Sequence, residues 1–389
     1  MKKIVLAYSG GLDTSVAIKW LKERGFDVVC CLVDIGQVSD FAKAKKKARA
    51  IGASKVYIVD ARNEFVKDFI FPALKANAVY EGKYFLATAL SRPLIAKVLA
   101  EVAKKEGAKY VGHGCTGKGN DQVRIEVSLG ALSRGLSVIA PVRLWDFPSR
   151  ESQIKYAKAN KIPVDATKKS PYSLDENLWG VSIECGVLEN PAIEPPKDAY
   201  QITKAPSDAP SKPAYIRVGF IKGVPKTLNG KPYSGTKLIE KISLIGAKHG
   251  VGRSDMIENR LVGIKSREIY EAPAAAILHK AHKELEALVL DRELLHFKDM
   301  VSLKYSELIY YGLWYSSLKE SLDSFIYKTQ GKVTGTVRLK LYKGNCTVVG
   351  RKSKLSLYSE ELATYSDKDK FDHKAAEGFI KIWGLPYKK

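Results

Sequence analysis

The sequence contains no hydrophobic run long enough to cross a membrane, because a spanning helix needs roughly 18 or more apolar residues in succession. At the N-terminus a basic MKK precedes the short apolar run IVLAY. This run is shorter than the roughly 7–15 residues of a signal-peptide core, and no small-residue cleavage site follows it. We therefore expect a buried strand here, a cytoplasmic protein and no membrane partner.

Cysteine is also sparse. The chain has five cysteines, and none of them has the CxxC spacing that is typical of zinc sites and redox pairs. Two are adjacent in the apolar run FDVVCCLVDIG, where a free cysteine behaves as a small hydrophobic residue. We expect reduced thiols, as in a cytoplasmic protein, and no metal site built from protein side chains.

Acidic residues are few relative to basic ones: 42 Asp and Glu stand against 64 Lys and Arg, which gives a net charge of +22. Such a balance is typical of proteins that bind nucleic acid or small anions. The lysines are spread along helical stretches such as 42–50 and 101–109, and they are not gathered with aromatic residues into an RNA-binding module. We expect a solvated basic surface, anionic substrates and no nucleic-acid partner.

Five apolar runs in the N-terminal part alternate with stretches of helical periodicity. The runs are residues 3–8, 27–33, 55–60, 109–113 and 136–141. The helical stretches end at Gly25, Gly52 and Gly107, which suits the left-handed residue that follows many helices. This alternation predicts an α/β fold with a doubly wound parallel sheet, whose ligands lie at the carboxyl ends of the strands.

The pattern changes after residue 190. Residues 189–215 are rich in proline and polar residues and predict a long ordered loop. A strand pair and a helix over 234–250 follow, then a helical region over 273–327 and a hairpin that turns at 343–345.

The chain ends in a predicted helix with an apolar face. Phe379, Ile382 and Trp383 have the i, i+3, i+4 spacing of one side of a helix. A terminal helix with such a face often docks onto another subunit, and we expect this one to do so.

The segment SGGLDTS, residues 9–15, follows the first apolar run. Its two glycines allow close approaches that a Cβ would obstruct, and the next helix presents free N–H groups and the positive end of its dipole. No lysine follows the glycines, so the segment is not a Walker A loop. It predicts an anion cradle with room for a pyrophosphate. It resembles the PP-loop of the ATP pyrophosphatases, which cleave ATP between its α- and β-phosphates.

A second glycine-rich run, GHGCTGKGND at residues 112–121, follows the fourth apolar run. Gly119 replaces the Ser or Thr of a Walker A loop, and the position after a fourth strand does not fit a dinucleotide fingerprint. Thr116, Asn120 and Asp121 instead form a polar cluster at the carboxyl end of a strand. Such a cluster suits an amino acid, with hydroxyl and amide groups for its carboxylate and Asp121 for its ammonium.

Six segments together resemble the argininosuccinate synthase family, in its order and spacing and over essentially the whole chain. They are AYSGGLDTS, YFLATALSRP, GHGCTGKGNDQVRIE, SPYSLDENLWG, KHGVGRSDMIENR and SREIYEAP. Members of this family join citrulline to aspartate with ATP in arginine biosynthesis. Taken with the change of pattern, the resemblance implies three parts: a PP-loop nucleotide-binding domain over 1–165, an α+β synthetase domain over 166–363 and a C-terminal oligomerisation helix over 364–389.

The resemblance also implies a site. The ATP set is Ala7, Tyr8, Ser9, Gly10, Gly11, Leu12, Asp13, Thr14 and Ser15, with Val33 and Gly114 beside the nucleoside. The citrulline set is Tyr84, Ala89, Asn120, Arg124, Ser173, Ser182, Glu258 and Tyr270, with Arg92 orienting a substrate carboxylate. The aspartate set is Thr88, Thr116, Asn120 and Asp121. Asn120, Asp121 and Arg124 are the candidates for the catalytic centre, and Asp121 is the candidate for orienting or deprotonating the aspartate amine.

Two positions depart from the family pattern. Ala89, in the citrulline segment, stands where the family often has Ser, so any side-chain contact there is lost. Cys115 stands where Ala is usual.

The reaction that the resemblance implies has two steps. The ureido oxygen of citrulline attacks the α-phosphorus of ATP, giving citrullyl-AMP and pyrophosphate, and the aspartate amine then displaces AMP. Mg²⁺ accompanies the ATP, and most of the catalysis is positioning, with no nucleophile–base pair required. The implied partners are ATP, L-citrulline, L-aspartate and further copies of the chain, in a homotetramer with C-terminal helices reaching between subunits.

One alternative from another class stays open at this point. A PP-loop enzyme of tRNA modification, of the thiolation or lysidine type, would account for the basic charge and for Cys115, since thiolation uses a reactive thiol. No second cysteine is placed as its partner, however, and the motifs beyond residue 80 would be left unexplained. A non-catalytic nucleotide-binding regulator would likewise leave the substrate set unexplained.

Overall fold

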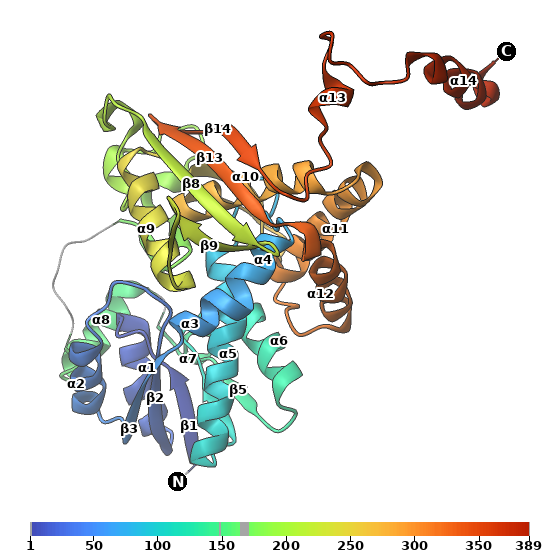
Figure 1. Cartoon of the computed structure of the whole chain (residues 1–389). Coiled ribbons are helices and arrows are strands. Elements are labelled where there is room, and N and C mark those ends of the chain that lie inside the picture. The colour runs from blue at the N-terminus through green and yellow to red at the C-terminus, as the bar shows by residue number, and fades with distance from the viewer. Residues whose placement is uncertain (1, 148, 164–170, 389) are drawn as a thin grey trace.

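The apolar runs of the N-terminal part form a five-stranded parallel sheet, as predicted (Figure 1). The computed structural model describes residues 2–147, 149–163 and 171–388. The strand order is β3-β2-β1-β4-β5. The strands are β1 (Lys2–Ala7), β2 (Phe26–Asp34), β3 (Lys55–Asp60), β4 (Tyr110–Gly112) and β5 (Ser137–Ile139).

Helices cover both faces of this sheet. Ile4 and Leu6 of β1 belong to one hydrophobic cluster, whereas Val5 between them belongs to another, as the alternation of side chains along a strand requires. The helices of this part are α1 (Leu12–Glu23), α2 (Phe41–Ile51), α3 (Arg62–Glu64), a π-helical turn (Phe65–Ile70), α4 (Phe71–Lys75), α5 (Ala87–Glu106), α6 (Asp121–Leu132), α7 (Pro141–Leu144) and α8 (Arg150–Ala159).

The glycine signals for helix ends are confirmed. Gly25, Gly52 and Gly107 have φ values of 77°, 114° and 63°, the left-handed conformation that follows a helix. The expected boundary between residues 165 and 166 lies outside the described residues.

Two antiparallel sheets form the second lobe. One has the order β10-β9-β8-β13-β14, and the other has the order β11-β12-β7-β6. The first comprises β8 (Ala214–Ile221), β9 (Val224–Leu228), β10 (Lys231–Pro232), β13 (Gly335–Tyr342) and β14 (Asn345–Lys352). The second comprises β6 (Ser173–Asn177), β7 (Gly180–Glu184), β11 (Arg253–Asn259) and β12 (Lys265–Glu271).

The predicted helices and turns of this lobe are present. The helices are α9 (Gly235–Lys248), α10 (Pro273–Val289), α11 (Arg292–Tyr310) and α12 (Ser317–Thr329). The β13–β14 hairpin turns at Lys343 and Gly344, whose φ values of 45° and 84° are both positive, as a tight hairpin turn requires. The proline-rich loop contains only short 3₁₀ turns.

The two lobes share one hydrophobic core. A single cluster of buried residues includes Val5 of β1, Leu90 of α5, Ile239 of α9 and Leu278 of α10. Helix α5 contacts β1 and β4 on one side and β6 and β7 on the other. The lobes therefore hold the site between them in a fixed arrangement.

The C-terminal segment leaves this body as an arm (Figure 1). It carries α13 (Glu360–Ala363) and α14 (His373–Trp383), the predicted terminal helix. The side chains of Phe379, Ile382 and Trp383 on α14 are 62%, 72% and 65% exposed. Among the helices of the described residues, none is both long and apolar enough to span a bilayer.

Candidate active site

A cavity of about 740 Å³ opens at the carboxyl ends of the parallel strands. Ala7 and Val33, at the ends of β1 and β2, line one side, and Gly114, after β4, lines it as well. Ser182 of β7 and Tyr270 of β12 line it from the second lobe. The cavity therefore lies where ligands of a parallel α/β sheet bind, and its far wall comes from the antiparallel lobe.

Most of the predicted site residues meet at this cavity. Those on its wall are Ala7, Tyr8, Ser9, Thr14, Val33, Tyr84, Thr88, Arg92, Gly114, Thr116, Asn120, Asp121, Arg124, Ser173, Ser182, Glu258 and Tyr270. Gly10, Gly11, Leu12, Asp13, Ser15 and Ala89 are not part of its lining. Ala89 is fully buried, and its N–H donates to the Tyr84 hydroxyl, so it lies behind the wall.

The loop between β1 and α1 has the form of an anion cradle. Gly10 has a φ of 84°, which favours glycine, and Gly11 precedes the first helical residue with no side chain of the described residues capping it. The Ser9 Oγ accepts the Gly11 N–H at 3.3 Å and lies 3.1 Å from the Thr14 Oγ1. The helix N-terminus and two hydroxyls thus converge on one place, the arrangement that binds phosphate.

The second glycine-rich loop lies directly against this cradle. A Cβ built on Gly114 would come within 2.9 Å of the Thr14 Cγ2, which real Cβ contacts do not tolerate. Glycine is therefore needed at 114 for the two loops to approach, and the contact brings the predicted amino-acid cluster beside the predicted phosphate site.

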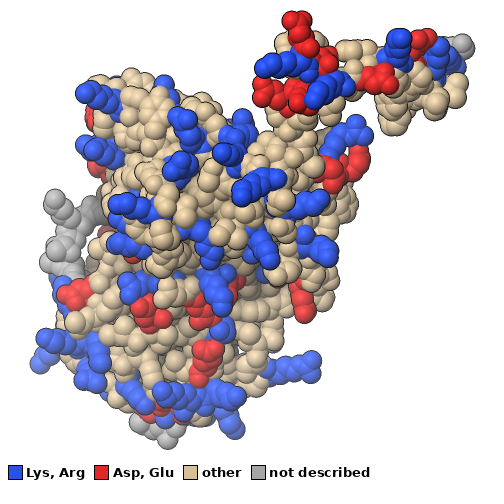
Figure 2. All heavy atoms as spheres, viewed as in Figure 1, with Lys and Arg blue, Asp and Glu red and all other residues tan. Residues whose placement is uncertain are grey.

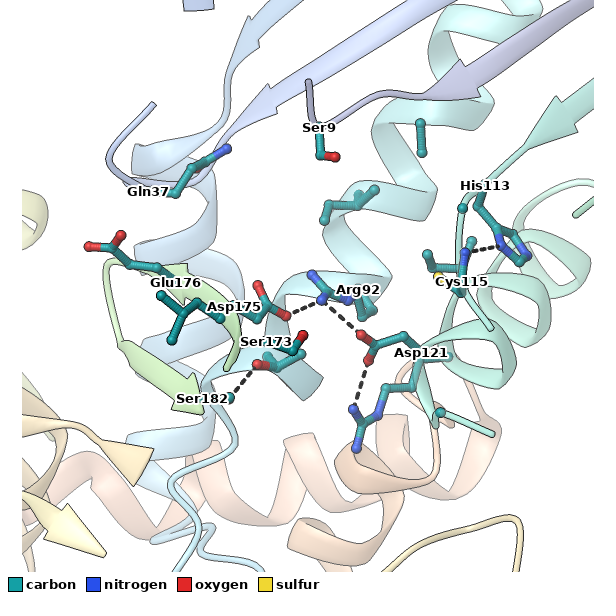
Figure 3. Close-up of a pocket in the computed structure, with 18 of the residues that line it drawn as sticks. Ser9, Gln37, Arg92, His113, Cys115, Asp121, Ser173, Asp175, Glu176 and Ser182 are labelled. Atoms are coloured by element: carbon teal, nitrogen blue, oxygen red, sulfur yellow. Dashed lines mark hydrogen bonds and ion pairs between the residues drawn. The ribbon is translucent and has the colours of Figure 1, made fainter. Parts of the chain in front are cut away.

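Two arginines and two aspartates form a charged chain across the cavity (Figure 3). The Arg92 Nη2 donates to the Asp121 Oδ2 at 2.8 Å and also contacts the Asp175 carboxylate. The Arg124 Nη1 donates to the Asp121 Oδ1 at 2.9 Å, and its Nε donates to the Tyr310 carbonyl. Both oxygens of Asp121 are thus held by guanidinium groups.

These ion pairs determine the protonation state of Asp121. Burial alone would raise the pKa of its carboxyl, but Arg92 and Arg124 outweigh burial and lower the pKa to about 2. Asp121 is therefore an ionised carboxylate that a cationic group can approach, and it is a poor proton acceptor at neutral pH. The geometry favours orienting an amine over deprotonating it.

Tyr84 stabilises the N-terminus of α5. Its hydroxyl oxygen accepts the N–H of Thr88 at 3.0 Å and the N–H of Ala89 at 3.2 Å. Leu86, just before the helix, has a φ of 63° and provides no side-chain cap. Burial raises the pKa of Tyr84 to about 12. Tyr84 therefore stays protonated, and what it offers a ligand is its O–H donor.

The Glu258 carboxylate accepts hydrogen bonds from two tyrosine hydroxyls. The Tyr270 hydroxyl donates to its Oε2 at 2.5 Å, and the Tyr310 hydroxyl donates to its Oε1 at 2.6 Å. The Tyr310 hydroxyl also accepts from the Asn120 Nδ2 at 2.9 Å. This set connects β11, β12, α11 and the second glycine-rich loop.

An acidic group lies beside Glu258 on the same wall. Glu184, Glu268 and Arg260 line the cavity, and Arg260 contacts both carboxylates. Burial, with Glu184 and Glu258 nearby, raises the pKa of Glu268 to about 8. The raised pKa of Glu268 reports a negative potential at this end of the cavity, which favours a cationic ligand group such as an α-ammonium.

Two wall residues, Asp175 and Arg260, and one residue that supports the wall, Tyr310, escaped prediction from sequence. Asp175 and Arg260 fall within two of the segments that carry the family resemblance, SPYSLDENLWG and KHGVGRSDMIENR, so their position was a signal that could have found them. Tyr310 lies on α11, whose sequence has the periodicity of an ordinary helix with one buried face. Nothing in that sequence indicates a contact with Glu258.

The described residues contain no group of three or more His, Cys, Asp or Glu side chains that could hold a metal ion.

Two family models together match nearly the whole chain. The family model "Arginosuccinate synthase N-terminal HUP domain" matches residues 3–163, and "Arginosuccinate synthase C-terminal domain" matches residues 172–389. The HUP-domain match is consistent with a PP-loop nucleotide-binding fold, whereas a tRNA-modifying enzyme is not favoured.

Curated relatives match over nearly their whole length. The chain is 57% identical over 386 residues to the argininosuccinate synthase of Geobacillus sp. (strain WCH70), which covers 99% of this chain and 96% of the relative. It is 56% identical over 387 residues to that of Bacillus thuringiensis (strain Al Hakam), and the match covers 100% of this chain and 96% of that relative. It is 57% identical over 387 residues to that of Halalkalibacterium halodurans, which covers 100% and 94%. The chain belongs to the argininosuccinate synthase family.

Proposed function

We propose that this protein is an argininosuccinate synthase, which converts ATP, L-citrulline and L-aspartate into argininosuccinate, AMP and pyrophosphate. The observation that carries the proposal is the junction of two glycine-rich loops at Gly114 and Thr14. This junction brings a phosphate cradle and an amino-acid cluster to one cavity. Membership of the family, over nearly the full length of its relatives, supports the same reaction.

ATP occupies the cradle in this proposal. The stretch from Ala7 to Ser15 wraps the phosphates, and the nucleoside lies beside Val33 and Gly114. Mg²⁺ arrives with the ATP phosphates as part of the substrate, since it prefers substrate phosphates with at most one or two carboxylates. When bound, it spreads the charge of the departing pyrophosphate.

Citrulline lies along the wall of the second lobe. Its carboxylate takes hydrogen bonds from Tyr84, Asn120 and Arg124, and its α-ammonium lies at the acidic end, near Glu258. Ser173, Ser182 and Tyr270 complete this set. Support comes from the donor character of Tyr84 and from the negative potential that raises the pKa of Glu268, beside Glu258.

Aspartate lies on the second glycine-rich loop, beside Thr88, Thr116 and Asn120. The ionised Asp121 orients its amine toward the ureido carbon. Arg92 holds Asp121 and Asp175 in place, so a substrate carboxylate would share its guanidinium with them.

The reaction proceeds in two displacements. The ureido oxygen of citrulline forms a bond to the α-phosphorus, and the bond to pyrophosphate breaks. The aspartate nitrogen then bonds to the ureido carbon, and AMP leaves with the former ureido oxygen. Holding three substrates in one arrangement supplies most of the rate enhancement.

Omission of single substrates tests this proposal. Purified protein with ATP, Mg²⁺, citrulline and aspartate is expected to form argininosuccinate and AMP in equal amounts, detected by mass spectrometry. Omitting aspartate should abolish argininosuccinate. Formation of AMP and pyrophosphate at an unchanged rate without citrulline would contradict the proposal.

The Cys115→Ala variant is expected to retain nearly full turnover. Burial, with Asp121 nearby, raises the pKa of Cys115 to about 12, so it is a thiol rather than the thiolate that thiolation chemistry needs. Steady-state rates of pyrophosphate release, compared with the unmodified protein, measure this. A loss near the roughly 100-fold that is typical of a direct participant would revive the tRNA-thiolation alternative.

We also propose a homotetramer in the cytoplasm that has no nucleic-acid partner. On the face in Figure 2, Lys and Arg side chains are scattered over both lobes with Asp and Glu among them, and no continuous basic groove is visible. The three parts of the chain keep the boundaries 1–165, 166–363 and 364–389 in this proposal.

Deletion of residues 364–389 is expected to lower the oligomeric state. Among the residues that the structure describes, nothing covers the apolar face of α14, and docking onto a neighbour would bury it. Light scattering of the full-length and truncated proteins measures the mass. An unchanged mass after truncation would exclude the arm as the assembly element.

A further inference from the structure

Four side chains with no role in the proposed reaction form a hydrogen-bonded row that the backbone of the second glycine-rich loop closes into a ring. They are His113, at the start of the loop, Gln122 and Glu126 on α6, and Arg143 on α7. His113 and Gln122 are buried, with 0% and 7% exposure.

Two members of the ring bind the backbone of the loop. The Gln122 Nε2 donates to the Gly117 carbonyl at 2.6 Å and to the Gly119 carbonyl at 3.3 Å. The Cys115 N–H donates to the His113 Nδ1 at 3.2 Å. Three hydrogen bonds therefore hold the short stretch that carries Thr116 and leads into Asn120 and Asp121.

The loop needs such support because its glycines are not fixed by their surroundings. A Cβ on Gly117 would meet nothing within 4 Å, and one on Gly119 would meet only the Thr116 Oγ1 at 3.8 Å. Glycine carries the largest backbone entropy of any residue. The order of residues 116–119 therefore rests on the hydrogen bonds to Gln122 and His113 more than on packing, whereas Asn120 is also held through its side chain by Tyr310 and Leu261.

The other two members, Arg143 and Glu126, join Gln122 to His113. The Arg143 Nη1 donates to the Gln122 Oε1 at 2.8 Å, and its Nη2 lies 2.7 Å from the Glu126 Oε1. The same carboxylate oxygen lies 3.0 Å from the His113 Nε2. Since the His113 Nδ1 accepts the Cys115 N–H, Nε2 carries the proton and donates it to Glu126. Burial lowers the pKa of His113, although Glu126 opposes this, and the ring holds it as the neutral tautomer.

We propose that Gln122, fixed by Arg143, is a positioning residue for the amine-donating amino acid, acting through the loop that carries Thr116, Asn120 and Asp121. The inference rests on the proposed function and deepens it. Gly114 is set separately, by its contact with Thr14, so the nucleotide side of the loop does not depend on Gln122. The ring therefore governs the second displacement more than the first.

The Gln122→Met and Gln122→Glu variants test the inference. Met keeps the length of the side chain without its hydrogen bonds, and Glu keeps an acceptor for Arg143 but loses the donor to the two carbonyls. Gln153→Met is the matched control, since Gln153 on α8 is similarly buried, at 9% exposure, and lies outside the cavity wall.

Both Gln122 variants are expected to raise the KM for aspartate roughly 10-fold, which is the loss of about one hydrogen bond's net worth. The KM values for ATP and citrulline should change less than about 2-fold. Exchange of labelled pyrophosphate into ATP, driven by citrulline in the absence of aspartate, should continue near the unmodified rate. The Gln153→Met control should leave all of these values unchanged.

An aspartate KM that does not move in either Gln122 variant would overturn the inference. An equal rise in all three KM values, with a parallel fall in melting temperature, would also overturn it, because a merely structural role acts on every substrate. Failure of the unmodified protein to catalyse citrulline-dependent exchange would instead refute the proposed function, and the inference with it.

Discussion

The Asp121→Asn variant is expected to lose at least about 100-fold in kcat/KM for aspartate. Two effects combine. The substrate ammonium loses a charge-assisted hydrogen bond, and the partly buried Arg92 and Arg124 lose the carboxylate that lies between them. The KM for aspartate should rise far more than the KM for citrulline, because Arg124 keeps its second anchor on the Tyr310 carbonyl.

Initial rates with each amino acid varied in turn measure this effect. Asp255→Asn is a matched control: Asp255 also pairs with an arginine, Arg267, but lies outside the cavity wall. Equal increases in the KM values for aspartate and citrulline would contradict the assignment of Asp121 to the aspartate amine.

The Arg92→Met variant is expected to lose about 3–5 kcal/mol of the free energy of unfolding at neutral pH, the usual cost of leaving buried charges unpaired. The Arg92 side chain is only 14% exposed and lies between Asp121 and Asp175. Without it, two neighbouring carboxylates face each other in a partly buried site. Arg62→Met, which removes an exposed partner of Asp60, should cost no more than about 1 kcal/mol.

The loss should depend on pH in a defined direction. In the unmodified protein the lowered pKa of Asp121 contributes stability that is present above its unfolded value of 3.8 and is lost as the pH falls toward about 2. Burial already raises the pKa of Asp175 beside Arg92. Without Arg92 that pKa should rise further and Asp121 should keep only Arg124, so the variant gains relative stability as the carboxyls take up protons. Urea unfolding should therefore show a smaller difference in the free energy of unfolding between the variant and the unmodified protein at pH 5 than at pH 7.5. A difference that is the same at both pH values would contradict this explanation.

The N-terminal part of the fold was predictable because its signals are local. Apolar runs, helical periodicity and glycines at helix ends identify each element, and the carboxyl ends of parallel strands must meet at one edge. The meeting of SGGLDTS and GHGCTGKGND follows from that rule. The close approach of Gly114 and Thr14 adds the detail that sequence alone could not provide.

The far wall of the cavity was less accessible to prediction. Its residues come from antiparallel strands, with Tyr310 of α11 bonded behind Glu258 and Asn120, and their contacts depend on how the second lobe packs across α5. The pairing of Tyr310 with Glu258 joins positions far apart in the chain, and each residue alone resembles an ordinary buried tyrosine or a surface acid. The role of Ala89 was expected from its neighbours in sequence, whereas helix geometry turns it away from the cavity into the core.

The most direct measurement follows the ureido oxygen of citrulline. The proposed mechanism requires this oxygen to attack the α-phosphorus and to leave on AMP when the aspartate amine bonds to the ureido carbon. With citrulline labelled by ¹⁸O in the ureido group, mass spectrometry of a complete reaction is predicted to find one labelled oxygen in each AMP and none in pyrophosphate. AMP without the label would contradict adenylation of citrulline at this site.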